Sequence, residues 1–192
     1  LCEYAHSMGN SIGNLREYWE TIENSQRIIG ACIWDWVDQA LVKQGEPEDH
    51  LYFGGSFGDQ PNDNDFCCNG IITADRRVTP KLLQVKQIYQ YVKFFLADGQ
   101  ITLDNRYSAT NLNEFALTYD VLKDGKTLHH GTLELPDCPA WNKCTMALPA
   151  EARDGEFINL YLQLKTATPW AEAGYIVAQE QLTLKETTNQ LA

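Results

Sequence analysis

The hydrophobic pattern of this chain changes near residue 96, and that change limits the folds open to it. Upstream, apolar runs alternate with segments of helical periodicity, whereas downstream apolar and polar residues alternate with a period of two. Alternating strands and helices favour a parallel α/β structure, and a series of short alternating strands favours an antiparallel sandwich. We therefore expect two domains, residues 1–96 and 97–192, in a chain that is α+β by content.

Residues 1–96 predict two strand–helix pairs. The strands are expected at 1–6 and 28–36, the second as a parallel strand buried on both faces, and the helices at 11–24 and 80–93. A long polar loop lies between the second strand and the second helix. Two such pairs cannot close a barrel or cover both faces of a sheet. This observation, together with a first residue that is not Met, leads us to expect a segment of a longer polypeptide.

Residues 97–192 predict an antiparallel sandwich of about seven strands. Ile101 and Leu103 alternate with polar residues, and Asp124-Gly125 is a strong signal for a hairpin turn. Clustered acids that would mark a site are not evident there. Trp141 and Trp170 are expected in the core or at an interface.

Composition excludes some classes of function. The net charge of −11 argues against nucleic acid as a partner, and no apolar run is long enough to span a membrane. The six cysteines form no CxxC pair and no zinc-site spacing, so we expect free thiols and a reducing, cytoplasmic location. Cys2 and Cys32, within the predicted strands, are expected to act as small hydrophobic residues.

Glu3 is the first candidate for chemistry, because it lies near the end of a predicted strand. In parallel α/β folds the carboxyl ends of strands form the reactive face. Such a carboxylate could be a nucleophile, a general acid or base, or a metal ligand. It could equally pair with a neighbour or cap the next helix, and His6 alone is most often a structural histidine.

A second candidate group follows the strand at 28–36. Trp34, Asp35, Trp36 and Asp38 combine aromatic faces with carboxylates, which suits sugar recognition, although core tryptophans and solvated acids explain the same letters. The polar loop offers oxygen ligands for hard cations such as Na⁺, Mg²⁺ or Ca²⁺, and it could equally be a solvated loop. These oxygens belong to Asp59, Asn62, Asp63, Asn64, Asp65 and Asn69.

Three motifs together resemble those of one enzyme family. LCEYAHSMGNS (1–11), WDWVDQ (34–39) and GGSFGDQPNDNDFCCNGI (54–71) are similar to segments of the lacZ-type β-galactosidases of glycoside hydrolase family 2, in the same order. The resemblance continues through the helix at 80–93 and, more loosely, through 170–184. It implies the last two βα units of a (β/α)8 barrel followed by an immunoglobulin-like β-sandwich.

The resemblance also implies an activity, which is the hydrolysis of terminal β-D-galactosyl residues, such as that of lactose, with retention of configuration. By the CEYAH motif Glu3 would be the nucleophile, and Tyr4, Ala5 and His6 would line the galactosyl site. Trp34 would form part of the apolar platform under the sugar. The acid/base glutamate would lie on an earlier strand, outside this chain, so we expect the chain alone to be inactive.

Metal ions and partners follow from the same resemblance. A sodium site would use the carbonyl of Phe66 and the side chain of Asn69, and a peripheral magnesium would lie near Asn62. The main magnesium ligands would lie outside the chain. The expected partners are a β-galactoside, the remaining domains of the longer chain and further copies in a homo-oligomer.

Two other hypotheses stay open from the sequence. One is a non-catalytic carbohydrate-binding module, and the other is a structural segment used for domain or subunit packing.

Overall fold

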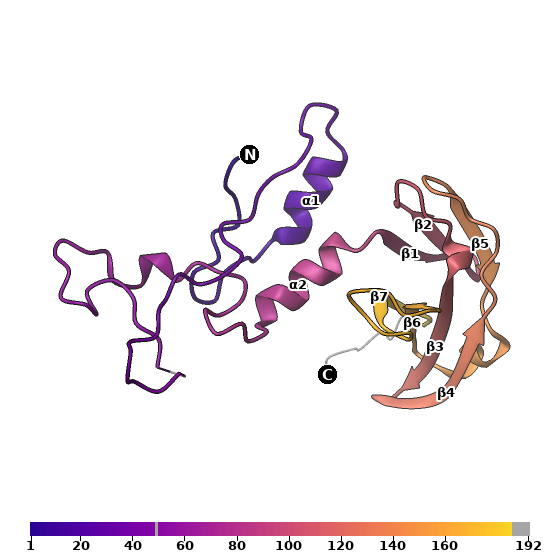
Figure 1. Ribbon diagram of the computed structural model, residues 1–192. Helices are drawn as coiled ribbons and strands as arrows, with labels where there is room; N and C mark the ends of the chain where they lie inside the picture. The colour runs from indigo at the N-terminus through magenta and orange to yellow at the C-terminus, as the bar shows by residue number, and fades with distance from the viewer. Residues whose placement is uncertain (49, 186–192) are drawn as a thin grey trace, which may run out of the picture. The chain divides into compact units, whose positions relative to one another are not determined.

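The computed structural model describes residues 1–48 and 50–185, which divide into two compact units (Figure 1). The first unit, Leu1–Tyr89, contains the α-helices and long loops, and the second, which begins at Gln90, is built from antiparallel strands. No helix among the described residues is long and apolar enough to cross a membrane.

The helices of the first unit form where the periodicity predicts them. Helix α1 spans Leu15–Glu23, a short 3-10 helix spans Asn64–Cys67, and helix α2 spans Pro80–Tyr89. Helix α2 ends before residue 93, the predicted end, because strand β1 begins at Val92. Both helices bury their apolar residues in one small core, which consists of Tyr4, Ile12, Leu15, Ile71, Val85 and Ile88.

The two predicted parallel strands of the first unit are much shorter than expected. Single parallel bridges join Tyr4 to Ile33 and Val37 to Ile72. The direction is therefore the predicted one, but the prediction of a strand at 28–36 buried on both faces is wrong. Ile29 in that segment is fully exposed, because no described residue packs against its side chain.

The second unit is a sandwich of two antiparallel sheets, with a three-stranded sheet in the order β1-β2-β5 and a four-stranded sheet in the order β4-β3-β6-β7. Apolar residues of both sheets form one buried cluster, among them Leu103 on the first sheet and Leu160 on the second. The strands are β1 (Val92–Ala97), β2 (Gln100–Asn105), β3 (Phe115–Lys123), β4 (Lys126–Leu133), β5 (Lys143–Ala147), β6 (Phe157–Leu164) and β7 (Ile176–Thr183). Three-residue and five-residue 3-10 helices lie at Leu112–Glu114 and Ala150–Asp154.

The hairpin predicted at Asp124-Gly125 is confirmed. These two residues join β3 to β4, and both have a positive φ, 51° and 70°. A two-residue loop with both residues in the left-handed region matches the twist of the flanking strands. The local sequence therefore sets the register of this pair of strands.

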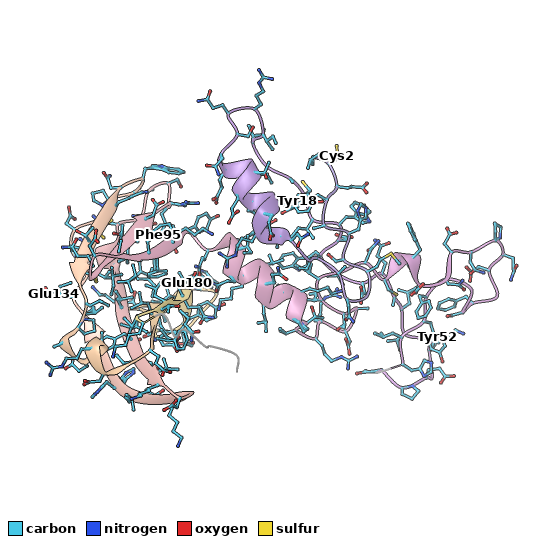
Figure 2. All side chains as sticks on the ribbon, turned by 180° about the vertical axis from the view of Figure 1, so that it is seen from behind. Cys2, Tyr18, Tyr52, Phe95, Glu134 and Glu180 are labelled. Atoms are coloured by element: carbon cyan, nitrogen blue, oxygen red, sulfur yellow. The ribbon has the colours of Figure 1, made fainter. Side chains whose placement is uncertain are left out.

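One expectation about exposure is wrong, and another is narrowed. Trp141 and Trp170 are not in the core, since 71% and 65% of their surfaces are exposed, which leaves an interface as their predicted place. Cys2 and Cys32 are also exposed rather than packed (Cys2 is labelled in Figure 2). All six cysteines, which lie within the described residues, are free thiols as predicted.

Truncating the sandwich core should unfold the second unit at a lower denaturant concentration. Leu160 is fully buried on β6, whereas Leu128 on β4 is 45% exposed. Leu160→Ala should lower the free energy of unfolding by about 2–5 kcal/mol, since it removes buried methyl groups and leaves a cavity. The matched change Leu128→Ala should cost less than about 1 kcal/mol. Urea denaturation followed by far-UV circular dichroism measures both, and equal losses would contradict this account of the core.

Candidate active site

The segment that carries Glu3 lies beside the segment that carries Trp34. The Tyr4 N–H donates to the Cys32 carbonyl at 3.0 Å, and the Trp34 N–H donates to the Tyr4 carbonyl at 3.0 Å. The Ser7 N–H then donates to the Trp34 carbonyl at 2.8 Å. Two motifs about 30 residues apart in the sequence are thereby brought together through the backbone.

The Glu3 carboxylate is open to solvent and paired with a histidine. Glu3 Oε2 lies 3.0 Å from Nε2 of His6, and the two side chains are 48% and 54% exposed. Ala5 between them has a φ of 48°, in the left-handed region. That conformation ends the extended backbone after Tyr4 and turns the chain, so that His6 can reach back to Glu3.

Tyr4 is placed differently from its neighbour Glu3. Its side chain is buried, its hydroxyl lies 2.6 Å from that of Tyr89, and its ring meets the edge of Tyr18 with the centroids 5.5 Å apart. Burial and the Tyr89 hydroxyl raise the pKa of Tyr4 well above its ordinary value. Tyr4 thus anchors the segment in the core of the first unit.

Trp34 and Trp36 are partly exposed to solvent, whereas Asp35 and Asp38 accept hydrogen bonds from backbone N–H groups. Trp34 is 37% exposed and Trp36 is 58% exposed. One carboxylate oxygen of Asp35 accepts from the Trp36 N–H at 2.5 Å, and Asp38 Oδ1 accepts from the Gly70 N–H at 2.7 Å. A Cβ at Gly70 would lie 2.1 Å from the Asp38 nitrogen, so glycine is needed for this approach.

The expected sodium ligands, Phe66 and Asn69, are three residues apart and in contact. Asn69 is 5% exposed, and its Nδ2 donates to the Phe66 carbonyl at 3.3 Å. Its Oδ1 is buried without a hydrogen-bond partner in the described structure. A buried oxygen without a partner, on a side chain whose Nδ2 reaches the Phe66 carbonyl, fits part of a site for a hard cation, because such ions take oxygen ligands. The Asn69 carbonyl also accepts from the Asp35 N–H, next to Trp34.

Asn62 makes its contacts within its own loop. Its Nδ2 donates to the Asp59 carbonyl at 2.9 Å, and its Oδ1 accepts from the Asn64 N–H at 3.2 Å. The Gly55 N–H donates to the Asp59 carboxylate and lowers the pKa of that group. No group of three or more His, Cys, Asp or Glu side chains that could hold a metal occurs in residues 1–48 and 50–185. The assignment of Asn62 to a peripheral magnesium stays a prediction.

Helix α2 contributes two residues that sequence reasoning missed. Tyr89 meets Tyr4 as described, and Lys81 Nζ donates to the carbonyl of the buried Ser7 at 2.6 Å. Both belong to the helix predicted at 80–93, to which the sequence assigned no site residue. No local signal in a single sequence singles them out, because each contact joins residues more than 70 positions apart.

Comparison with known proteins agrees with this arrangement. The family model for the TIM barrel domain of family 2 glycosyl hydrolases matches residues 1–94, and the model for domain 4 of β-galactosidase matches residues 101–185. The chain therefore belongs to glycoside hydrolase family 2. Within that family it is of the lacZ type, as its motifs indicate.

Its relatives are β-galactosidases. The chain is 41% identical to the β-galactosidase of Priestia megaterium over 96% of its own length and 19% of that protein. It is 38% identical to β-galactosidase 2 of Enterobacter cloacae over 94% of its length, and 36% identical to the β-galactosidase of Psychromonas ingrahamii over 96%; it covers 18% and 19% of these proteins. The chain thus spans about a fifth of the length of the curated relatives that it matches.

The contribution of the Tyr4 hydroxyl to the stability of the first unit should be lost at alkaline pH. A raised phenol pKa means that folding favours the neutral form, so this contribution is complete below the ordinary pKa of 10.0 and is lost as the pH rises above it. Tyr4→Phe should lower the free energy of unfolding by about 1 kcal/mol at pH 7 through the lost hydrogen bond. The difference from the unmodified chain should shrink above pH 10.

This prediction is checked by urea denaturation of the chain at several pH values, followed by tryptophan fluorescence, since Trp19 lies against Tyr89 with the ring centroids 4.9 Å apart. Tyr18→Phe is the control, because the Tyr18 ring edge touches Tyr4 while its surface is 46% exposed. A stability difference between the Tyr4 variant and the unmodified chain that stays constant from pH 7 to pH 11 would contradict the prediction.

Proposed function

We propose that this chain is part of a retaining β-galactosidase, a longer polypeptide that hydrolyses terminal β-D-galactosyl residues such as that of lactose. One observation carries the proposal: a solvent-open Glu3 carboxylate, paired with His6, on a segment held beside the partly exposed Trp34. The similarity to β-galactosidases gives that arrangement its substrate class.

In this proposal Glu3 attacks the anomeric carbon of the galactoside. Its carboxylate oxygen forms a bond to C1 while the bond from C1 to the leaving oxygen breaks, and water later hydrolyses the resulting ester. A second carboxylic acid protonates the leaving oxygen, and in retaining enzymes the two groups are about 5–5.5 Å apart. We assign that acid to a segment outside these 192 residues. The chain alone should therefore be inactive.

The remaining groups bind and orient the sugar. In this proposal His6 donates a hydrogen bond to a sugar hydroxyl, and the face of Trp34 packs against the apolar C–H face of a pyranose. Tyr4 and Ala5 lie on the segment that lines the site. Glu3 and His6 share a hydrogen bond at 3.0 Å, so a hydroxyl bound by His6 would lie close to the nucleophile.

We assign a sodium ion to the Phe66 carbonyl and Asn69 Oδ1, and a peripheral magnesium to the neighbourhood of Asn62. A cation there would supply a fixed positive charge beside the sugar site. The main magnesium ligands would come from outside the chain. Support for the sodium site is the buried Asn69 oxygen that lacks a hydrogen-bond partner in the described structure.

We also propose an immunoglobulin-like sandwich for residues 97–192, a homo-oligomeric state for the longer polypeptide and a cytoplasmic location. The three-plus-four order of the sheets, β1-β2-β5 against β4-β3-β6-β7, supports the first of these.

Covalent trapping tests the nucleophile directly. When the longer polypeptide is treated with a 2-deoxy-2-fluoro-galactoside that has a good leaving group, peptide mapping should find the label on Glu3. Glu3→Gln should lower kcat by several orders of magnitude and abolish labelling, because the amide cannot form the ester. Glu17→Gln, which removes an exposed acid of helix α1, is the control and should retain normal turnover.

Two results would refute the assignment of Glu3. One is a label on another residue, and the other is near-normal turnover of Glu3→Gln. Binding of galactose without any turnover by the unmodified longer polypeptide would favour a carbohydrate-binding module instead.

Asn69 should control the affinity for sodium. Asn69→Ala removes the oxygen that lacks a partner and should raise the sodium concentration for half-maximal binding by about tenfold or more. The broadening of the ²³Na resonance on addition of the longer polypeptide measures binding independently of activity. Asn62→Ala is the control and should leave that concentration within about twofold. Equal sodium affinity in the Asn69 variant and the unmodified protein would remove Asn69 from the site.

A further inference from the structure

We propose that Tyr4, Tyr89 and Lys81 are positioning residues, which hold the Glu3 segment along helix α2 and thereby aim the Glu3 carboxylate. This inference rests on the proposed function and goes beyond it, since none of the three acts on the sugar in this role. Each acts through the backbone that carries Glu3 and His6.

Two contacts fix the segment on helix α2, and we call them the first and second hold. The first hold is the hydrogen bond between the hydroxyls of Tyr4 and Tyr89. Their oxygens are 2.6 Å apart, and Tyr4 is 5% exposed. Because Tyr4 directly follows Glu3, its ring fixes the rotation of the segment about its own axis. With the Tyr4 ring inserted between α1 and α2, the Glu3 side chain remains at the surface, where it is 48% exposed.

The second hold is an ammonium group on a backbone carbonyl. Lys81 Nζ donates to the carbonyl of Ser7 at 2.6 Å, and Ser7 is fully buried. Ser7 directly follows His6, the partner of Glu3. The two holds therefore lie on either side of Ala5 and His6, and the first of them directly follows Glu3.

The spacing of the two holds suits their role. Lys81 and Tyr89 are eight residues apart on a helix that rises 1.5 Å per residue, which places them about 12 Å apart along its axis. Tyr4 and Ser7 are three residues apart on a segment that turns at Ala5, and the long side chains of Tyr4, Tyr89 and Lys81 span the rest of that distance. The segment can thus lie along α2, with its start at the end of the helix and its end at the beginning of the helix.

Glu3 itself has little to orient it. Its carboxylate contacts His6, a side chain that is itself 54% exposed. The direction of the carboxylate therefore depends on the backbone beneath it. A displacement of about 1 Å in a reacting group can cost about 100-fold in rate, so loosening either hold should slow attack on C1 more than it weakens sugar binding.

The test uses the longer polypeptide and the same 2-deoxy-2-fluoro-galactoside, and it separates the rate of labelling at saturation (kinact) from the inhibitor affinity (Ki). Tyr4→Phe and Tyr89→Phe keep the rings and remove one hydroxyl each. Each should lower kinact by about 10-fold to 100-fold, with Ki within about twofold. The double variant should lose little more than either single one, because both hydroxyls form one bond.

Two further variants make the test specific. Lys81→Met removes the second hold alone and should also lower kinact at constant Ki. Tyr18→Phe removes a hydroxyl from the same aromatic group and leaves the hydrogen bonds of both holds in place, so its kinact should equal that of the unmodified protein. Circular dichroism at the assay temperature identifies folded variants, and where a tyrosine variant unfolds, the Lys81 variant decides.

The outcomes distinguish this inference from the proposed function. Labelling of Glu3 with kinact unchanged in Tyr4→Phe, Tyr89→Phe and Lys81→Met overturns the positioning role and leaves the nucleophile assigned. A rise in Ki with unchanged kinact also overturns it, since sugar binding would then be affected instead. Absence of labelling at Glu3 in the unmodified protein refutes the proposed function itself.

Discussion

The arrangement of the first unit depends on the backbone pairing of two segments at Tyr4. Its N–H and carbonyl each form a 3.0 Å hydrogen bond with the segment at 32–34, and these bonds place the Glu3 motif beside the Trp34 motif. Because the pairing is parallel, both segments continue into loops on the same side. One of these loops carries His6, and the other leads towards Asn69. Without these two hydrogen bonds, Glu3 and His6 would not lie beside Trp34.

The two units are stabilised in different ways. The second has seven strands in its described part and one apolar cluster that includes residues of both sheets. The first has two helices and isolated bridges, and exposes several large apolar side chains, among them Ile29 and Leu41. Such exposure is expected of a barrel segment whose other elements contribute the opposite surfaces. It accords with a chain that matches about a fifth of its relatives' length.

Features with a local cause could be predicted from the sequence. Helix α1 follows from apolar residues at helical spacing, and the β3–β4 hairpin follows from Asp124-Gly125. Features that depend on distant partners could not. The run of apolar residues at 28–36 predicted a strand buried on both faces, but burial requires neighbouring elements that the described residues do not provide. For the same reason the sequence could not decide between core and interface for Trp141 and Trp170, since hydrophobicity alone does not specify what covers a side chain.

The site divides in the same way. Glu3, His6 and Trp34 were found through motif resemblance, and the structure brings their segments together. Tyr89 was missed, because its hydrogen bond to Tyr4 joins residues 85 positions apart and leaves no local pattern. That separation also has a kinetic consequence. Closing so long a loop is entropically costly, and contacts between distant residues slow folding. The Glu3 segment is synthesised before helix α2, yet its anchor forms only after the last turn of helix α2 exists. Assembly of the site should therefore be a late event in the folding of the first unit.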